Sequence, residues 1–241
     1  MKAKKFHQFV ELQKGPINTA IINFLTGDVY QVKNTIIEKF NAGKYAEIPS
    51  DVQSFYDAGL IIDIDPQDWI PRFEADDSPE EMEFPLILEV EAGVDEVLIE
   101  KLSSHTTFSV SILSEKDFDK CKQKSIISGD FDNINRDTYL FHKRYNSCWG
   151  NKIVLTVKGE IKTCIHSNIV VCDLREHEPE EILKKLEKYH YLNKDKVEKC
   201  KDCELRYVCF DCREIAFREN GDLHSPNPYC NYDPYNGTWK E

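Results

Sequence analysis

The chain has 241 residues, of which 41% are hydrophobic and 31% charged, a balance typical of a folded globular protein with room for two small domains and a connecting segment. Its net charge of −12 argues against nucleic acid as a partner, because binding a phosphate backbone needs a positive field. The start MKAKKFHQF has no apolar signal segment and no apolar run is long enough to span a bilayer, so we expect a cytoplasmic protein without a membrane partner.

Residues 1–65 are predicted to form a compact α+β unit. Stretches of strand character separated by turn signals come first, and apolar residues at helical spacing follow. Ser50 opens the second helix, with Gln53 in the position of a capping box. The expected elements are strands over 6–12, 19–24, 29–32 and 60–64, and helices that begin at Asn34 and Ser50.

A linker and a short αβ segment are predicted next. Residues 66–83 are acidic, contain three prolines and have weak apolar periodicity, which is typical of a linker. Residues 84–140 contain a strand, a short amphipathic helix and a second strand, in FPLILEVEAG, GVDEVLIEKLSSH and TTFSVSIL, and this order favours parallel strands. Residues 122–138 are polar and predict loop or short turns. The segment has no acid, base and nucleophile set, so no catalytic residue is predicted.

A β-hairpin and a helix are predicted within residues 141–241. NKIVLTV and EIKTCI flank a turn at Lys158 and Gly159, which brings Cys148 and Cys164 to the same end of a two-stranded ribbon. Pro179 begins an amphipathic helix in PEEILKKLEKYHYL. The aromatic tail over 229–239 is expected to cover the last cysteine and exclude water.

Seven of the nine cysteines form the strongest pattern in the chain, which runs from Cys148 to Cys230. Two pairs, CKDC and CFDC, leave two residues between their cysteines, so both sulfurs of a pair can face one metal from a tight turn. In a reducing cytosol, clustered cysteines bind metal or act in catalysis more often than they form disulfides, so we expect metal. The remaining two, Cys121 and Cys172, are expected to be small buried side chains.

Spacing alone does not separate zinc from a 4Fe-4S cluster, because both are held by thiolates. Two closed zinc sites need eight ligands, so seven cysteines would require a histidine or carboxylate as well. A cluster can instead leave one iron open to water, substrate or a weak ligand. The odd count favours iron and sulfide, with zinc as the alternative.

The residues around these cysteines resemble the SPASM domain, the C-terminal extension of radical S-adenosylmethionine enzymes that modify peptides. The resemblance rests on Cys148, on Gly159 with four residues before Cys164, on CKDCELRYVCFDCRE, and on PYCNYDPYNGTW, whose cysteine follows Cys212 after seventeen residues. The chain is most similar to the maturase of the grasp-with-SPASM peptide systems, which is paired with an ATP-grasp ligase and a small precursor peptide. The match is strong over residues 140–241 and weak over residues 6–64.

The resemblance implies two 4Fe-4S clusters. One would be bound by the four-cysteine site, which is Cys200, Cys203, Cys209 and Cys230. The other would be bound by the three-cysteine site, which is Cys148, Cys164 and Cys212. The family has a further cysteine shortly before the first of these three, and this chain has His142 near that place, as a fourth ligand or as an ordinary side chain. The gap between the CFDC cysteines is two residues where many SPASM domains have three, so ligands could be shared differently.

Two cations accompany the thiolates in sequence. Arg206 and Arg213 could donate to sulfur, or they could pair with Glu204 or Asp211.

The family's radical chemistry needs three cysteines in a C-x3-C-x2-C loop, and this chain has no such triplet. Its length also cannot hold a peptide-binding domain, a partial barrel of about 200 residues and a SPASM domain together. We therefore expect no S-adenosylmethionine and no radical activity, and any other enzymatic activity stays open. Residues 84–140 are interpreted as a truncated remnant of the barrel.

Beside this resemblance, residues 1–65 look like a winged-helix-like, PqqD-type peptide-recognition domain. Such domains hold the leader of a precursor peptide by adding it as a strand to a sheet edge. The alternative is a small α+β domain whose apolar residues only form its core. The predicted function is therefore that of an accessory or scaffold protein in peptide maturation, with the precursor leader and an ATP-grasp ligase as partners. The alternatives are a cluster-based redox protein or enzyme with an open iron, and a structural zinc module.

Overall fold

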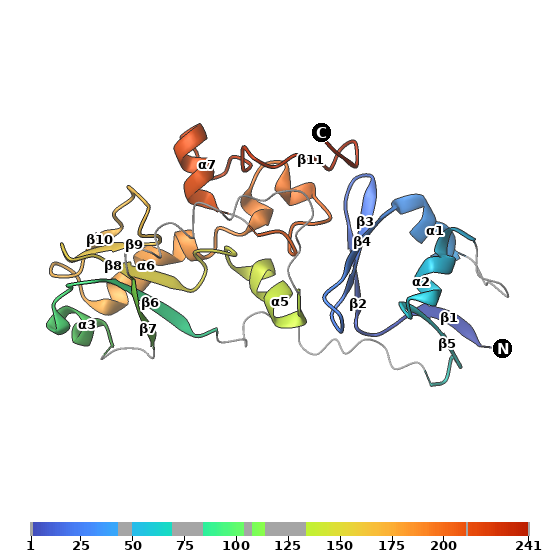
Figure 1. Cartoon of the computed structure of the whole chain (residues 1–241), viewed down its shortest axis with the longest axis horizontal. Helices are drawn as coiled ribbons and strands as arrows, with labels where there is room; N and C mark the ends of the chain where they lie inside the picture. Colours follow the sequence, from blue (N-terminus) through green and yellow to red (C-terminus); the bar gives the residue numbers. More distant parts are fainter. Residues whose placement is uncertain are drawn as a thin grey trace.

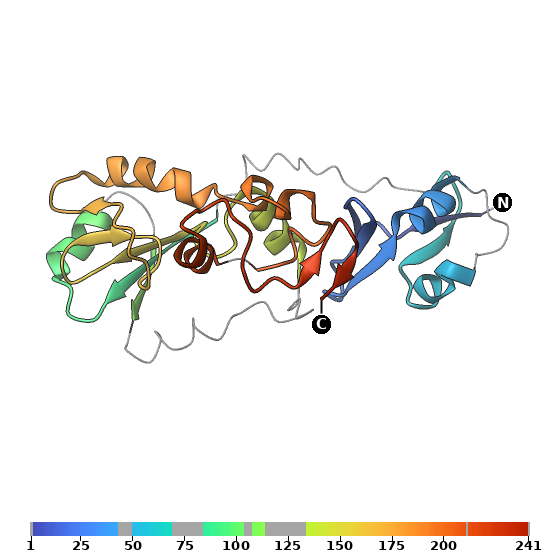
Figure 2. The same cartoon turned by 90° about the horizontal axis from the view of Figure 1, so that it is seen from above.

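The computed structural model describes residues 2–42, 50–68, 84–103, 108–113, 134–210 and 212–240. These form a mixed α+β protein, as the sequence predicts. Its elements run from an N-terminal unit at one end to a five-stranded sheet at the other, with the cysteine-rich segment between them (Figures 1 and 2). Within these ranges, none of the helices combines the length and apolar character that a membrane crossing requires.

The N-terminal unit contains two small antiparallel sheets. Strands β2 (Val10–Lys14), β3 (Asn18–Asn23) and β4 (Val29–Lys33) form one, and β1 (Ala3–Phe6) pairs with β5 (Ile61–Ile64) in the other. The β3–β4 hairpin and its turn at 26–28 follow the prediction. The single strand expected over 6–12 is wrong, because the Val10 N–H donates to the His7 carbonyl at 2.9 Å and turns the chain between β1 and β2.

Two helices complete this unit. Helix α1 (Asn34–Ala42) begins where the sequence predicts. The second helical segment consists of a 3-10 turn, η1 (Ser50–Val52), and α2 (Gln53–Asp57). Gln53 lies in the helix and donates to Asp57 at 2.7 Å, so the predicted capping box is not formed.

Strand β3 contributes to cores on both of its faces, because successive side chains of a strand point in opposite directions. Ile21 packs with Val10, Ile37 and Leu60 inside the N-terminal unit. Ala20 and Ile22 pack on the other side, in a cluster with residues of the cysteine-rich segment such as Leu205 and Tyr232. The three-stranded sheet therefore lies between the N-terminal helices and the cysteine-rich segment.

The second sheet has five strands in the order β10-β9-β8-β6-β7. They are β6 (Leu86–Glu91), β7 (Phe108–Leu113), β8 (Lys152–Leu155), β9 (Glu160–Lys162) and β10 (Cys172–Asp173). The β6–β7 pair is parallel and the β8–β9 pair is an antiparallel hairpin, as predicted. Strand β8 also pairs in parallel with β6, so the sheet joins elements from both sides of the boundary expected at residue 140.

Helices α3 (Glu96–Ser103) and α6 (Pro179–His190) pack against this sheet through Leu102 and through Ile182 and Leu186. Helix α6 begins at Pro179, as predicted. The remaining described elements are α5 (Arg136–Arg144), η2 (Lys194–Lys196), η3 (Cys200–Asp202), α7 (Arg213–Asn220), β11 (Tyr232–Asp233) and β12 (Thr238–Trp239). Helix α5 overturns the loop expected over its first residues. Residues 69–83 of the predicted linker, residues 122–133 of the predicted loop and Cys121 lie outside the described residues.

Candidate metal centre

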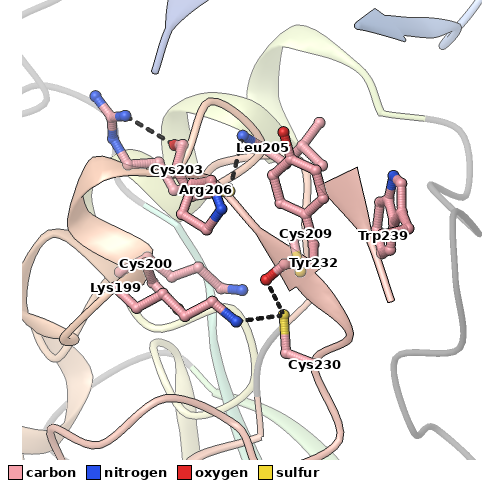
Figure 3. Close-up of a pocket in the computed structure, with 11 residues that line it drawn as sticks. Lys199, Cys200, Cys203, Leu205, Arg206, Cys209, Cys230, Tyr232 and Trp239 are labelled. Atoms are coloured by element: carbon pink, nitrogen blue, oxygen red, sulfur yellow. Dashed lines mark hydrogen bonds between the residues drawn. The ribbon is translucent and has the colours of Figure 1, made fainter. Parts of the chain in front are cut away.

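All four cysteines of the four-cysteine site line a single pocket in the described part of the chain (Figure 3). The pocket has about 400 Å³ of empty space, part of which is open to solvent. Its other lining residues are Lys194, Lys199, Leu205, Arg206, Tyr232, Pro234 and Trp239. Cysteines up to thirty positions apart in sequence thus line one pocket.

Short turns present these cysteines. Cys200 begins the 3-10 turn η3, and the Cys203 N–H donates to its carbonyl at 3.0 Å. The Cys209 N–H donates to the Leu205 carbonyl at 2.9 Å, which closes the next turn. Cys230 stands just before β11. Tight turns suit thiolate ligands because they let neighbouring sulfurs face one centre.

Two donors approach the sulfurs directly. The Leu205 N–H donates to Cys203 Sγ at 3.4 Å, and Lys199 Nζ donates to Cys230 Sγ at 3.9 Å (Figure 3). Burial raises the pKa of the Cys203 thiol to about 12, against a smaller opposing effect of the Leu205 N–H. At neutral pH this thiol therefore stays protonated unless a metal takes the place of the proton.

The charges of the pocket suit an anionic inorganic group. Lys194, which is buried, and Lys199 and Arg206 bring three cations to the four cysteines. Four thiolates around a 4Fe-4S core leave a net negative charge, which cations and sulfur hydrogen bonds offset. Arg206 also donates to the Cys203 carbonyl at 2.9 Å and pairs with Asp195 at 3.2 Å. Asp211 lies outside the described residues.

The three-stranded N-terminal sheet lies behind one wall of this pocket, where it hydrogen-bonds the lining residues Tyr232 and Trp239. The Tyr232 hydroxyl donates to Glu204 and accepts from Asn18 Nδ2 at 3.0 Å. Gln31 donates to Glu204 Oε1 at 2.9 Å and accepts from Trp239 Nε1 at 3.2 Å. Glu204 is 0% exposed. Burial, and then the Glu204 hydrogen bond, raise the pKa of Tyr232, which keeps its hydroxyl a donor.

The three-cysteine site is built around the β8–β9 hairpin and the start of α7. Cys148 lies in the turn before β8, Cys164 follows β9, and Cys212 is the N-cap residue of α7. Burial lowers the pKa of Lys152, but Cys148, Glu89 and Cys164 together outweigh that effect and raise it. The Lys152 ammonium group therefore interacts electrostatically with both hairpin cysteines, as expected if they lie at the same end of the ribbon.

Cys148 is held in place by Asn146, which is buried. Asn146 Oδ1 accepts from the Cys148 and Trp149 N–H groups at 2.9 and 2.7 Å, and its Nδ2 donates to the Leu192 carbonyl at 3.1 Å. This side chain therefore fixes the turn that carries the cysteine against the segment after α6.

Several buried polar groups beside the three-cysteine site have no hydrogen-bond partner in the described structure. They are Trp149 Nε1, Thr163 Oγ1 and both carboxylate oxygens of Glu214. Each belongs to a residue one or two positions from a cysteine of the site. Burying such groups unpaired costs free energy, so a bound group is expected there. Inorganic sulfide accepts hydrogen bonds and iron binds carboxylate, so these residues fit a 4Fe-4S cluster.

The other predicted residues have separate roles. His142 Nδ1 lies 2.9 Å from the Tyr207 carbonyl. Arg213 donates to the Leu223 and Ser225 carbonyls. Cys172 lies on β10 and is buried, as predicted. No disulfide joins any of the eight cysteines that the structure describes.

Within the described ranges, no three His, Cys, Asp or Glu side chains are arranged to hold a single metal ion. The cysteines of the four-cysteine site line one pocket. Cys148 and Cys164 both act on Lys152. Cys212 does not join that pair in a group that could hold a single metal ion within the described ranges. Sequence reasoning missed Lys199 and Glu214. The only sequence signal for either residue is its position beside a predicted ligand.

Comparison with known proteins gave no match, neither to a family model nor to a curated protein nor to a solved structure.

Proposed function

We propose that this chain is an iron–sulfur protein of the SPASM kind that assists the maturation of a ribosomally synthesised peptide. Its C-terminal half would bind two 4Fe-4S clusters, and its N-terminal unit would bind the leader of the precursor. In this role it serves as an accessory or scaffold to a modifying enzyme, for which an ATP-grasp ligase is the proposed partner.

The observation that carries this proposal is the shared pocket of the four-cysteine site. Its cysteines come from CKDC, from the start of CFDC and from the aromatic tail, and they line one cavity together with three cations. A bound 4Fe-4S cluster supplies an electron-transfer centre or a rigid structural node. The chain's own residues would neutralise that cluster through Lys194, Lys199 and Arg206 and limit water through Leu205 and Trp239.

The edge strands of the N-terminal unit support the proposal that it binds a peptide. Strands β2 and β4 are the outer strands of the three-stranded sheet, so each is a candidate to accept an added strand. The net charge of −12 favours a basic peptide segment. A scaffold of this kind would bring the peptide close to the cysteine-rich half without itself carrying a catalytic group.

The first test is metal analysis of the full chain purified without oxygen. We expect a brown protein with about eight irons and a matching amount of acid-labile sulfide. The Cys203→Ser variant should lose about half of this iron, because it removes one ligand of the four-cysteine site. Cys172→Ala is the matched control, since Cys172 is also buried but lies outside the pattern. A colourless protein that contains zinc would refute the cluster assignment and favour the structural zinc module.

The second test is binding of a fluorescent synthetic leader from a precursor peptide encoded beside this gene. We expect the full chain to raise the fluorescence anisotropy of this peptide, and a scrambled peptide of the same composition to be bound at least tenfold more weakly. Equal binding of both peptides, or of neither, would contradict leader recognition while leaving the iron result intact.

A cluster-based redox protein is the second candidate. The three-cysteine site favours it, because three thiolates leave one iron of a 4Fe-4S cluster without a cysteine. A reversible one-electron titration together with no binding of the leader peptide would favour this candidate over the scaffold.

A further inference from the structure

Glu214 is a buried carboxylate without a polar partner. It lies in the first turn of α7, two residues after Cys212, and is 2% exposed. Neither of its carboxylate oxygens has a hydrogen-bond partner in the described structure. A carboxylate is rarely buried unless it is hydrogen-bonded, paired or bound to a metal. This side chain therefore needs a positive centre at the start of α7, the helix that Cys212 caps.

The adjacent cation is directed elsewhere. Arg213 Nη1 donates to the carbonyl oxygens of Leu223 and Ser225 at 2.9 and 2.6 Å. These bonds fix the start of α7 against the segment that follows the helix. They also leave the Glu214 carboxylate without an ion pair to this arginine in the structure.

A series of hydrogen bonds links the start of α7 to the turn that carries Cys148. The Glu198 N–H donates to the His224 carbonyl at 2.9 Å, which ties the segment after α7 to the segment after α6. That second segment accepts from Asn146 through the Leu192 carbonyl, and Asn146 holds the Cys148 N–H. Hydrogen bonds thus connect the start of α7 to the turn that carries Cys148 by way of the segments that follow α7 and α6.

The donors of the site also point to an inorganic centre. Trp149 Nε1 and Thr163 Oγ1 are buried without partners beside two of the three cysteines, and a cluster sulfide would accept from both. Three cysteines account for three irons of a 4Fe-4S cluster. The fourth iron needs another ligand, and a carboxylate oxygen is an established ligand type for iron in proteins.

We propose that Glu214 is the fourth protein ligand of the cluster at Cys148, Cys164 and Cys212. This inference rests on the proposed function, because it needs a cluster at the three-cysteine site. It replaces His142 as the fourth ligand. A carboxylate is a harder and more readily exchanged ligand than a thiolate, so the iron bound to Glu214 is the one that an added thiol or carboxylate would reach.

The test compares Glu214→Ala, Glu214→Gln and Glu214→Cys in the full chain, purified without oxygen and treated briefly with ferricyanide. We expect the Ala and Gln variants to lose one iron, leaving about seven of about eight, and to show the electron paramagnetic resonance signal of a 3Fe-4S cluster. Glu214→Cys should retain the iron and show little of this signal, because it supplies a fourth thiolate. Glu219→Ala is the matched control, since Glu219 is exposed on the same helix.

The outcomes separate this inference from the proposed function. Wild-type protein without iron would overturn both. Wild-type protein with about eight irons, together with Glu214→Ala and Glu214→Gln variants that lose no iron and show no 3Fe-4S signal, would overturn the role of Glu214 alone. A 3Fe-4S signal in His142→Ala but in neither of those two variants would overturn it in favour of the histidine. Glu214→Gln keeps the shape of the side chain, so it guards against a loss of iron caused by misfolding.

Discussion

The contact between the N-terminal sheet and the pocket wall can be tested by one methyl group at Gly15. A Cβ atom at this position would lie 2.5 Å from Glu204 Oε2, 3.0 Å from the Glu204 backbone nitrogen and 3.1 Å from the Glu204 Cβ. The carboxylate could rotate away, but the backbone nitrogen and Cβ cannot. Gly15→Ala therefore forces a shift between the sheet and the segment that carries Cys203.

The expected cost follows from what such a shift disturbs. Overpacking of a tight contact costs about 1–3 kcal/mol. Glu204 accepts from Gln31 and from the Tyr232 hydroxyl, and weakening hydrogen bonds to a buried carboxylate adds about 1 kcal/mol or more. We expect Gly15→Ala to lower the free energy of unfolding by about 2–4 kcal/mol, or the melting temperature by roughly 5–10 °C.

Urea unfolding followed by circular dichroism measures this difference, and iron content measures its effect on the four-cysteine site. Gly59→Ala is the control, because its Cβ would meet nothing within 4 Å while its φ of +72° adds only backbone strain of about 1 kcal/mol. A change of less than about 0.5 kcal/mol in Gly15→Ala would show that the sheet does not press against Glu204, and the close contact between them would be refuted.

Three further predictions concern single side chains. Burial lowers the pKa of His190 despite its hydrogen bond to the Lys152 carbonyl, so the unfolded chain binds the proton more readily and stability is lost as pH falls below the ordinary pKa of 6.5. The urea concentration at the unfolding midpoint should therefore fall as the pH is lowered from about 7.5 to about 5, and His190→Gln should flatten this dependence. An equal slope in both proteins would contradict the role of His190. In metal-free protein at about pH 8, a Cys203 pKa of about 12 leaves about one thiolate in ten thousand, so iodoacetamide should label Cys203 far more slowly than an exposed thiol. Peptide mapping by mass spectrometry would show this, and early labelling of Cys203 would count against its burial. Lys199 has a φ of +64°, so Lys199→Gly should stabilise the metal-free fold by about 1 kcal/mol. The same change removes the donor to Cys230 Sγ, so it should lower the reduction potential of the bound cluster. An unchanged potential would show that the ammonium group does not act on the sulfur.

Local signals in the sequence predicted much of the scaffold correctly. Gly159 has a φ of +80° in the hairpin turn between β8 and β9, a conformation that glycine adopts readily. Pro179 begins α6, where its fixed φ suits the first helical position. Strands β6 and β7, which are separated by helix α3, pair in parallel, as the order of strand, helix and strand implies. Each of these features is decided within a few residues or by a simple connection rule.

The features that the sequence did not predict depend on distant contacts. The break at His7 between β1 and β2 follows from pairing of β1 with β5, more than fifty residues away. The place of β8 beside β6 joins two segments that looked separate. Glu204 and Glu214 are buried although glutamate is most often exposed, and only the tertiary structure shows this. The pairs of cysteines could be read from spacing, whereas the carboxylate and lysine beside them could not.

The pocket and the N-terminal sheet depend on the same side chains, which connects the two parts of the proposed function. Tyr232 and Trp239 line the four-cysteine pocket, and their polar groups bond Asn18 on β3 and Gln31 on β4. A cluster that fixes Tyr232 and Trp239 from one side would favour the position of the sheet on the other. A peptide strand added at the edge of β4 would fix the position of Gln31, and so would favour its hydrogen bonds to Trp239 and Glu204. Binding of the cluster and binding of the leader would then stabilise each other, because linkage between two sites is reciprocal.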